Sequence, residues 1–369
     1  LIASFWVKGR GMIGVVSVQA GSRIYQHEVK DMPQSKEDSH IVAAYGLGKC
    51  PKLVQQVMSG PDALQVRRNA LKVLCEEFRN PMSISGCAKA GVFRVLPHYV
   101  LDDDLVTCEQ SSRALALGAQ DYNGRTAMLK EGAPATIIAA LDSGPVSVRC
   151  NVYEALVNAA AMAPGVKALV AAGYPAKLVE KVASEVDELK TKALKVLCAC
   201  LRDGDGLQQA LKNKAVEEFI ALLASKEVEV RKEAAITLGT ICFNEMAKIV
   251  AIQANGVGFL AQLLDDENVN VRAASLGALM TITTVDAGKR AILDTNAVEL
   301  TLHTIQQGKT VALLNALKLV ASMAAHPDLR SQIKDDEASL NTVKELEECD
   351  DPMLATHATI ARQAVLWTP

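Results

Sequence analysis

Residues 256–296 read GVGFLAQLLDDENVNVRAASLGALMTITTVDAGKRAILDTN and contain three separate helical patterns. Apolar residues at helical spacing across 259–264 predict a short helix, and the polar run 265–268 supplies turn and capping groups. A longer apolar helix is expected at 271–283, and one more helical turn at 288–293. This stretch therefore predicts a unit of three helices.

An aliphatic residue recurs every 41 residues on both sides of this stretch: Leu74, Leu115, Leu156, Leu197, Leu238, Leu279 and Val320. Four positions earlier, on the same face of the expected helix, the residues are mostly small: Ala70, Ser111, Val152, Ala193, Ala234, Ser275 and Ala316. Small side chains let helices approach closely. We therefore expect the long helices of successive units to stack on one another.

A second series with the same 41-residue spacing marks the boundaries between units: Gly91, Gly132, Gly173, Lys214, Asn255 and Asn296. Glycine and asparagine accept the left-handed backbone that ends a helix. Lys214 departs from this preference and predicts a different turn at its boundary. An arginine also begins the expected long helix in four units, at Arg67, Arg149, Arg231 and Arg272.

Repeats of this length and helix order resemble the armadillo and HEAT classes, and a unit opened by glycine favours armadillo. The sequence predicts an all-α protein, a right-handed armadillo/HEAT-like α-solenoid of about seven repeats of about 41 residues. We expect the array at 41–336 and capping helices at 337–369, with a turn at 349–352 and a more polar outer face. Residues 1–40 predict an N-terminal arm, which is a hairpin, a partner-bound strand or a poorly ordered tail, with strand-like alternation at 12–26.

Composition and net charge argue against several classes of partner. The 369 residues are 50% hydrophobic and 4% aromatic with a net charge of -3, which gives no global reason to expect nucleic acid or an anionic membrane. No apolar run reaches the roughly 18 residues of a membrane span, and residues 1–21 lack the order of a secretory signal. The nine cysteines fall mostly within apolar helical patterns and predict reduced, buried thiols in a cytosolic compartment.

Three short motifs could carry chemistry, but their contexts argue against it. The G-x-G-x-x-G segment at 9–14, GRGMIG, is followed by an expected strand rather than the helix of a phosphate-binding loop. Cys198 and Cys200 point to different sides of a helix, which favours core packing over metal. The DGDG segment at 203–206 lacks the remaining ligands of a calcium loop and predicts a turn. We predict no enzyme activity, no metal, no cofactor and no small-molecule substrate.

A solenoid offers a long concave face to partners. In armadillo nuclear-import adaptors, which the repeat resembles, Trp and Asn line this groove two residues before and two after the register leucine. The first position here holds Lys72, Arg113, Glu154, Lys195, Ile236, Gly277 and Lys318, and the second holds Glu76, Leu117, Asn158, Ala199, Thr240, Thr281 and Ser322. The absent tryptophans and the single asparagine disfavour the import function.

We select as candidate partner-binding groove residues Lys72, Arg113, Glu154, Asn158, Lys195 and Lys318. Four of the seven side chains at the first position are basic, which suits an acidic partner segment. The alternative is a solvated helix face, because long charged side chains commonly occupy exposed positions.

Over residues 44–369 the chain resembles the radial spoke head fourteen homologue family, armadillo-repeat components of the radial spokes in motile cilia. The resemblance is carried by segments in a fixed order: AYG at 44–46, PKL at 51–53, AL at 70–71 with LC at 74–75, N-x-Y-x-A at 151–155, GALM at 277–280, GK at 288–289, LNA at 314–316 and A-x-P-x-x-R at 325–330. Residues 1–30 have no counterpart in this resemblance.

The resemblance implies a non-catalytic structural scaffold of the ciliary or flagellar axoneme, with a cytoplasmic pool before assembly. Its partners would be other radial spoke and axonemal proteins, and it would reach the doublet microtubules through that complex. The alternative is a soluble cytoplasmic armadillo adaptor that binds partner peptides in its concave groove. A spoke subunit would remain with the axoneme after detergent extraction, whereas an adaptor would wash out.

Overall fold

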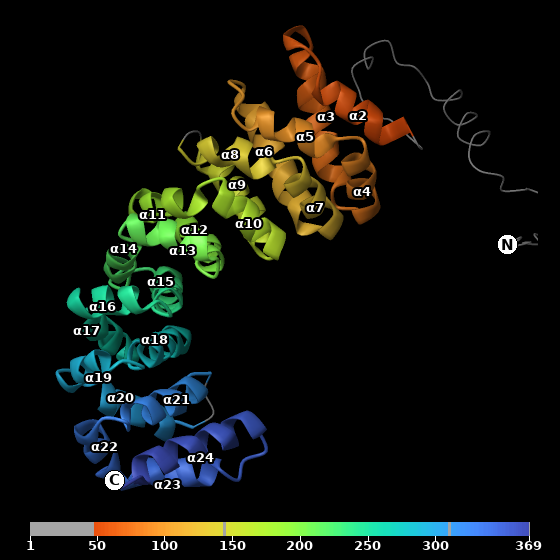
Figure 1. Cartoon of the computed structure of the whole chain (residues 1–369). Coiled ribbons are helices and arrows are strands. Elements are labelled where there is room, and N and C mark those ends of the chain that lie inside the picture. Colours follow the sequence, from red (N-terminus) through yellow and green to blue (C-terminus); the bar gives the residue numbers. More distant parts are fainter. Residues whose placement is uncertain (1–47, 143–144, 309–310, 369) are drawn as a thin grey trace, which may run out of the picture.

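The computed structural model describes residues 48–142, 145–308 and 311–368, and the regular elements in these ranges are all helices (Figure 1). They follow one another in a curved row from α2 at one end to α24 at the other. This confirms the predicted all-α solenoid. The predicted arm at 1–40, with its glycine motif and strand-like segment, lies outside the described residues, as do the first residues of the predicted array.

Each unit is built around a long helix. The long helices are α3 (Leu64–Glu77), α6 (Leu105–Gln120), α9 (Val146–Ala160), α12 (Asp187–Cys200), α15 (Val228–Ile241), α18 (Val269–Ile282), α21 (Leu313–Met323) and α24 (Pro352–Leu366). Each follows an opening helix: α2 (Lys49–Val57), α5 (Val92–Tyr99), α8 with η3 (Ala133–Ile137 and Ile138–Leu141), α11 (Tyr174–Ser184), α14 (Ala215–Leu222), α17 with η4 (Gly256–Gln262 and Leu263–Asp265), α20 (Ala297–Gln306) and α23 (Glu337–Leu346).

A medium helix follows each long helix from α3 to α21 before the next unit begins. The medium helices are α4 (Pro81–Lys89), α7 (Tyr122–Lys130), α10 (Ala163–Ala171), α13 (Gly204–Lys212), α16 (Glu245–Gln253), α19 (Asp286–Leu293) and α22 (Pro327–Lys334), and the turn η2 (Pro61–Ala63) precedes α3. Polar residues cap many of these helices. Asn268 accepts a hydrogen bond from the Asn270 N–H at 2.9 Å, so the predicted turn before the long helix at 271–283 does supply its cap.

The register of aliphatic residues forms the continuous core. All six leucines of the series are completely buried, and Val320 is only 1% exposed. Successive long helices pack directly on one another from α3 through to α24. Burying each leucine contributes about 2 to 3 kcal/mol, so this register is the main stabilising feature of the stack.

The boundary register forms left-handed turns at five of its six positions. Gly91, Gly132 and Gly173 have φ of 84°, 72° and 82°, and Lys214 and Asn255 have φ of 60° and 58°. The prediction of a different turn at Lys214 is therefore wrong, because packing of α13 and α14 imposes the left-handed conformation at a cost of about 1 to 2 kcal/mol. Asn296, with φ of -87°, is the one boundary position of the six that is not left-handed.

A second set of glycines fixes how each medium helix folds back on the long helix before it. A β-carbon at these positions would lie only 1.9 to 2.3 Å from a carbonyl oxygen at the end of the long helix. The pairs are Gly124 with Gly118, Gly165 with Ala159, Gly206 with Cys200, and Gly288 with Ile282. These glycines lie 41 residues apart or a multiple of it, so the period that marks Gly91, Gly132 and Gly173 could have identified them.

The arginines at the starts of the long helices hold the preceding turns. Arg231 donates from Nη1 to the carbonyl oxygens of Ser225 and Lys226, at 3.0 and 2.9 Å, and from Nε to Asp266 Oδ2 at 2.7 Å. Asp266 belongs to the equivalent turn of the next unit. The arginine register therefore links neighbouring repeats in addition to closing a turn.

The C-terminal helices continue the same spacing. Ala361 lies 41 residues after Val320 and is completely buried, and α24 packs on α21 as the earlier long helices pack on one another. The predicted turn at 349–352 is present, with Asp351 capping α24 and Pro352 opening it. The outer face of α24 is mixed, because Met353 and Ile360 are exposed on it together with Thr356 and Gln363.

Candidate partner-binding surface

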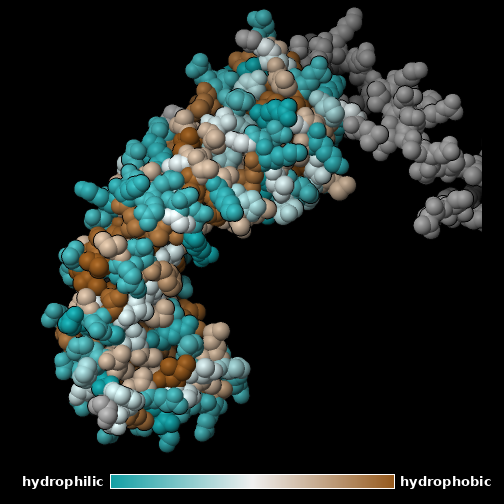
Figure 2. All heavy atoms as spheres, viewed as in Figure 1, coloured by the Kyte–Doolittle hydropathy of each residue, from teal (hydrophilic) through white to brown (hydrophobic). Residues whose placement is uncertain are grey.

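The candidate residues lie on the long helices of the stack. Figure 1 shows α15, α18 and α21 on the inner side of the curve and α16, α19 and α22 on its outer side. The inner side is hollowed between the middle of the array and the C-terminal helices (Figure 2). Because the long helices stack in order, a residue at one register position recurs along one face of the array.

Lys72 on α3 and Arg113 on α6 are exposed cations at equivalent positions of adjacent helices. Within 48–142, 145–308 and 311–368, neither side chain forms a hydrogen bond or an ion pair. Burial raises the pKa of the nearby Cys75 to about 12, and the charge of Arg113 only partly opposes that rise. These two side chains are therefore available to an anionic group from another molecule.

Glu154 and Asn158 on α9 already have internal partners. Glu154 Oε1 lies 2.8 Å from Lys192 Nζ on α12, and Lys192 also lies 3.0 Å from Cys150 Sγ. Burial lowers the pKa of Lys192, but the bonds to Cys150 and Glu154 outweigh this and leave it raised. Asn158 donates from Nδ2 to the Glu154 carbonyl oxygen of its own helix at 2.9 Å. The Glu154–Lys192 ion pair connects α9 with α12, whereas the Asn158 bond stays within α9.

Lys195 and Lys318 lie on the same face, farther along the array. Lys195 on α12 is exposed and its Nζ lies 3.9 Å from Glu233 Oε1 on α15. Burial raises the pKa of Glu233 even though Lys195 and Lys232 both favour its carboxylate. Lys318 on α21 is half-buried, and its charge adds to burial in lowering the pKa of His357 on α24. The six candidates therefore share a face but do not form one continuous basic patch.

Side chains five residues before the register leucine bridge adjacent long helices in four units, a feature not predicted from the sequence. They are Asn151, Lys192, Glu233 and Asn315, whereas the equivalent Asn69 bonds within its own helix and Ala274 has no polar group. Asn151 donates from Nδ2 to Ser112 Oγ at 3.1 Å, and Asn315 donates from Nδ2 to the Ala273 carbonyl oxygen at 2.8 Å. Recurrence of polar residues at one register position is the signal that could have found them.

The other motifs have structural explanations. Cys198 Sγ lies 3.3 Å from Thr240 Oγ1, and burial raises the pKa of Cys200 to about 12, so this pair packs within the core. Asp203 caps α13 by accepting from the N–H groups of Asp205 and Gly206, at 3.0 and 3.2 Å. In the part of the chain that the structure describes, no group of three or more His, Cys, Asp or Glu side chains could hold a metal ion.

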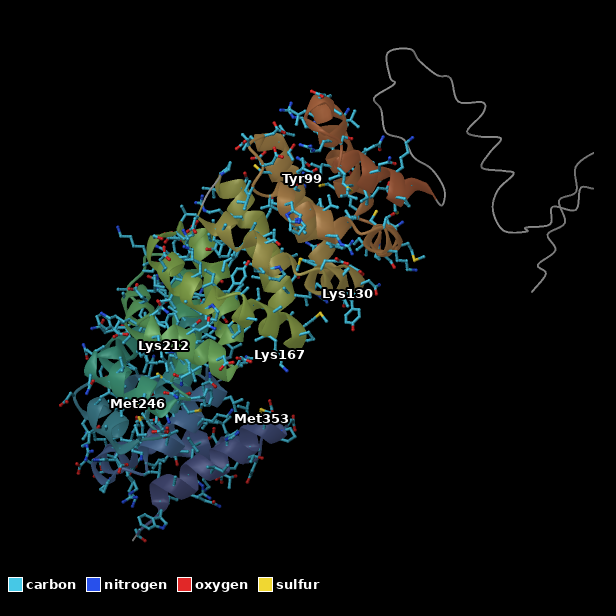
Figure 3. The ribbon with its side chains drawn as sticks, turned by 45° about the horizontal axis from the view of Figure 1, so that its top comes forward. Tyr99, Lys130, Lys167, Lys212, Met246 and Met353 are labelled. Carbon is cyan, nitrogen blue, oxygen red and sulfur yellow. The ribbon has the colours of Figure 1, made fainter. Side chains whose placement is uncertain are left out.

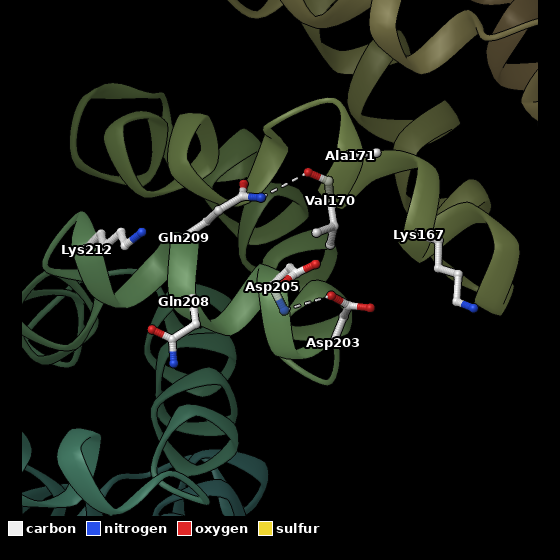
Figure 4. Close-up of a pocket in the computed structure, with 8 residues that line it drawn as sticks. All are labelled: Lys167, Val170, Ala171, Asp203, Asp205, Gln208, Gln209 and Lys212. Carbon is white, nitrogen blue, oxygen red and sulfur yellow. Dashed lines mark hydrogen bonds between the residues drawn. The ribbon is translucent and has the colours of Figure 1, made fainter.

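A shallow pocket of about 500 Å³ lies between α10 and α13, and Figure 4 shows its lining. Gln209 crosses it and donates from Nε2 to the Val170 carbonyl oxygen at 3.1 Å, while Lys167 and Lys212 project from its two sides. The carboxylate of Asp203 is occupied by the helix cap. The pocket is thus the open seam between two medium helices.

No single helix among the described residues is long and apolar enough to cross a membrane. The helical segments Glu245–Gln253 and Gly256–Asp265 are together long and apolar enough, but the chain bends by 74° between them.

Comparison with solved structures defines the class of protein. The crystal structure of an engineered protein superposes with a TM-score of 0.78 at 24% identity, covering 86% of this chain and 78% of that one. A designed armadillo repeat protein, solved in complex with the peptide (KR)4, superposes with a TM-score of 0.58 at 22% identity and covers 63% of this chain and 99% of its own. Residues 228–282, from α15 through α18, match a family of HEAT-like repeats. The chain is an α-solenoid of the armadillo/HEAT class.

The chain is also similar in sequence to a curated protein. Radial spoke protein 14 of Chlamydomonas reinhardtii is 26% identical over 258 residues, which cover 66% of this chain. The match also covers 66% of that relative, just under two thirds of its length. The chain is thus similar to a radial spoke protein over about two thirds of its own length.

Proposed function

We propose that this protein is a non-catalytic scaffold of the ciliary or flagellar axoneme, where it serves as a radial spoke subunit and binds other spoke proteins. The similarity to radial spoke protein 14 over 258 residues carries the proposal. The stacked array supports it, because a solenoid provides long surfaces for several partners. Doublet microtubules would be reached through the other spoke proteins.

The exposed face of α3 and α6 that carries Lys72 and Arg113 is proposed to bind an acidic partner segment. Lys72 and Arg113 supply free positive charge there, and Lys195 adds a third cation that its distant contact with Glu233 only partly neutralises. The designed armadillo protein described above is in complex with a basic peptide, (KR)4. Two unpaired cations on adjacent helices favour a segment of the opposite charge here.

Charge reversal tests the acidic-partner part of the proposal. The variant Lys72→Glu/Arg113→Glu/Lys195→Glu should weaken retention of the full chain on detergent-extracted axonemes and reduce the salt dependence of that retention. The matched control is Lys130→Glu/Lys167→Glu/Lys212→Glu, which reverses the same number of charges at exposed lysines on the medium helices (Figure 3). Equal retention of both variants would contradict the acidic-partner proposal.

Retention of the unaltered chain tests the scaffold proposal itself. A spoke subunit stays with the axoneme after detergent and crosslinks to spoke proteins there, as crosslinking mass spectrometry would show. The alternative is a soluble armadillo adaptor, favoured by the open inner face of the array. Complete release of the chain with the soluble proteins would support the adaptor and sink the spoke proposal.

A further inference from the structure

The outer side of α24 repeats positions that are buried in the preceding units. One register contains Thr107, Val148, Leu189, Val230, Val271 and Ala312, all at most 2% exposed, and ends at Met353, which is 58% exposed. A second contains Ala114, Ala155, Val196, Thr237, Ala278 and Leu319, all at most 1% exposed, and ends at Ile360, which is 45% exposed. Helix α24 thus exposes large apolar side chains at positions that are buried in α6 through α21, whereas the equivalent Val66 and Val73 of α3 are partly buried.

The neighbouring helix α23 has changed in the opposite sense. The register position that is buried as Phe219 in α14 and Leu260 in α17 is Thr342 in α23, and it is partly exposed. Glu345 occupies the position of the buried Thr304 of α20 and is exposed. The outer face of α23 is therefore polar at these positions, whereas α24 exposes Met353 and Ile360.

Acidic side chains precede Met353 at the end of α23 and in the turn that leads into α24. Glu345 and Glu348 on and after α23, and Asp350 in the turn before α24, are exposed and form no ion pair within the described ranges. Glu347 is neutralised by Arg362, whose Nε lies 2.8 Å from Glu347 Oε1. Against these three carboxylates stands one exposed lysine, Lys344, so the segment before Met353 has a net negative charge.

We propose that the α24 face, defined by Met353 and Ile360, is a docking site for an amphipathic helix of a partner protein, with an apolar stripe flanked by Lys or Arg. Residues seven apart lie two turns apart on one side of a helix, so the two side chains can receive a stripe of i, i+3/4, i+7 spacing. The net negative charge of the segment before Met353 favours basic flanks on that helix. The same face of a second copy would bring like charges together, which disfavours self-association.

Two synthetic helical peptides provide the probes, with an identical leucine stripe over about five turns and either Lys or Glu on its flanks. Binding to the full chain is measured by fluorescence anisotropy at low and at physiological salt. The Lys-flanked peptide should bind at least about tenfold more tightly than the Glu-flanked one, and this difference should shrink as salt increases. Equal affinity of the two peptides would overturn the proposed charge selectivity and with it the proposal.

Substitutions locate the binding surface. Met353→Ser/Ile360→Ser should weaken the Lys-flanked peptide about tenfold without lowering the melting temperature, because both side chains are exposed. Met82→Ser/Tyr122→Ser is the matched control, since it removes two exposed apolar side chains from α4 and α7 and should leave binding unchanged. Glu345→Gln/Glu348→Gln/Asp350→Asn should reduce the preference for basic flanks.

Two outcomes would reject the docking site. Undiminished peptide binding by the Met353→Ser/Ile360→Ser variant would place the peptide elsewhere. Sedimentation showing a dimer of the intact chain that the same variant abolishes would identify a second copy as the occupant. These measurements use the purified chain alone, so they can fail while the spoke proposal stands.

Discussion

The joint between α3 and α6 and the joint between α18 and α21 share one apolar frame but differ in their polar contacts. In the α3–α6 joint, Arg67 donates from Nη1 to Asp102 Oδ2 at 3.4 Å and from Nε to the Val57 carbonyl oxygen at 3.2 Å, and its guanidinium lies 4.5 Å from the ring centre of Tyr99. Arg68 pairs with Asp104, which also caps α6. Charged groups therefore hold this joint.

The α18–α21 joint is held by uncharged groups. Asn315 bonds to the Ala273 carbonyl oxygen at 2.8 Å, and Thr283 Oγ1 lies 2.9 Å from Ser322 Oγ. Within the described ranges no ion pair connects these two helices. Gly277 lets them approach, because a β-carbon there would lie 3.3 Å from Asn315 Nδ2. One stacking geometry thus accepts two kinds of polar contact, provided that the register leucines stay buried.

The largest expected effect is common to both joints. Leu115→Ala in α6 and Leu279→Ala in α18 should each destabilise their units by about 2 to 5 kcal/mol, because each removes a completely buried side chain and leaves a cavity. Local free energies from hydrogen exchange would measure both, and neighbouring units should lose protection first. A large loss in only one joint would show that the apolar frame is not shared.

Removing the polar contacts should separate the two joints. Arg67→Ala should cost about 3 kcal/mol in the α3–α6 joint, because it leaves Asp102 and two carbonyl oxygens without their donor. Asn315→Ala should cost about 1 kcal/mol, the net value of one neutral hydrogen bond. The same exchange measurement applies, and equal costs would remove the distinction between charged and uncharged joints.

The turns that lead into these joints differ as well. Gly91, before α5, is left-handed, whereas Asn296, before α20, is not. Gly91→Ala should therefore cost about 1 to 2 kcal/mol through backbone strain, and Asn296→Ala should change stability by less than about 0.5 kcal/mol. Thermal unfolding of the two variants beside the parent would test this. A comparable loss in both would mean that backbone strain does not set the difference.

The smallest effect is a difference in acid sensitivity. The hydrogen bond from Arg68 lowers the pKa of Asp104 despite its burial, and the bonds from Thr107 lower it further. A carboxylate whose pKa is lowered on folding stabilises the folded protein at pH values above its unfolded pKa of about 3.9. This stabilisation is lost as the pH falls through the folded pKa. Asp104→Asn should flatten the loss of stability below about pH 4, measured by urea unfolding across pH, because the variant has no carboxylate there to titrate.

Asn315→Leu is the matched control for the acid titration. It alters the uncharged joint without removing a titrating group, so it should keep the acid slope of the parent chain. If Asp104→Asn also kept that slope, the Arg68–Asp104 pair would not be a source of the acid sensitivity.

Much of the fold follows from periodicity, whereas the candidate surface does not. Leu238 and its equivalents could be placed in the core because a residue repeated every 41 positions on a helix face needs a repeated packing partner. The candidate residues could be assigned to one face for the same reason. Their availability could not be predicted, because Glu154 is engaged by Lys192 from the next unit while Lys72 has no such neighbour.

The amino-acid sequence by itself determined the helices, their length and order, and the register of the core, because helix periodicity and burial of apolar residues act along the chain. Only the tertiary structure decided that Lys214 is left-handed, that Arg67 reaches Asp102, and that the outer face of α24 is exposed. These features depend on which groups of neighbouring helices come within a few ångströms of each other. Such distances are set by the stacking of units, and the order of residues within one unit does not contain them.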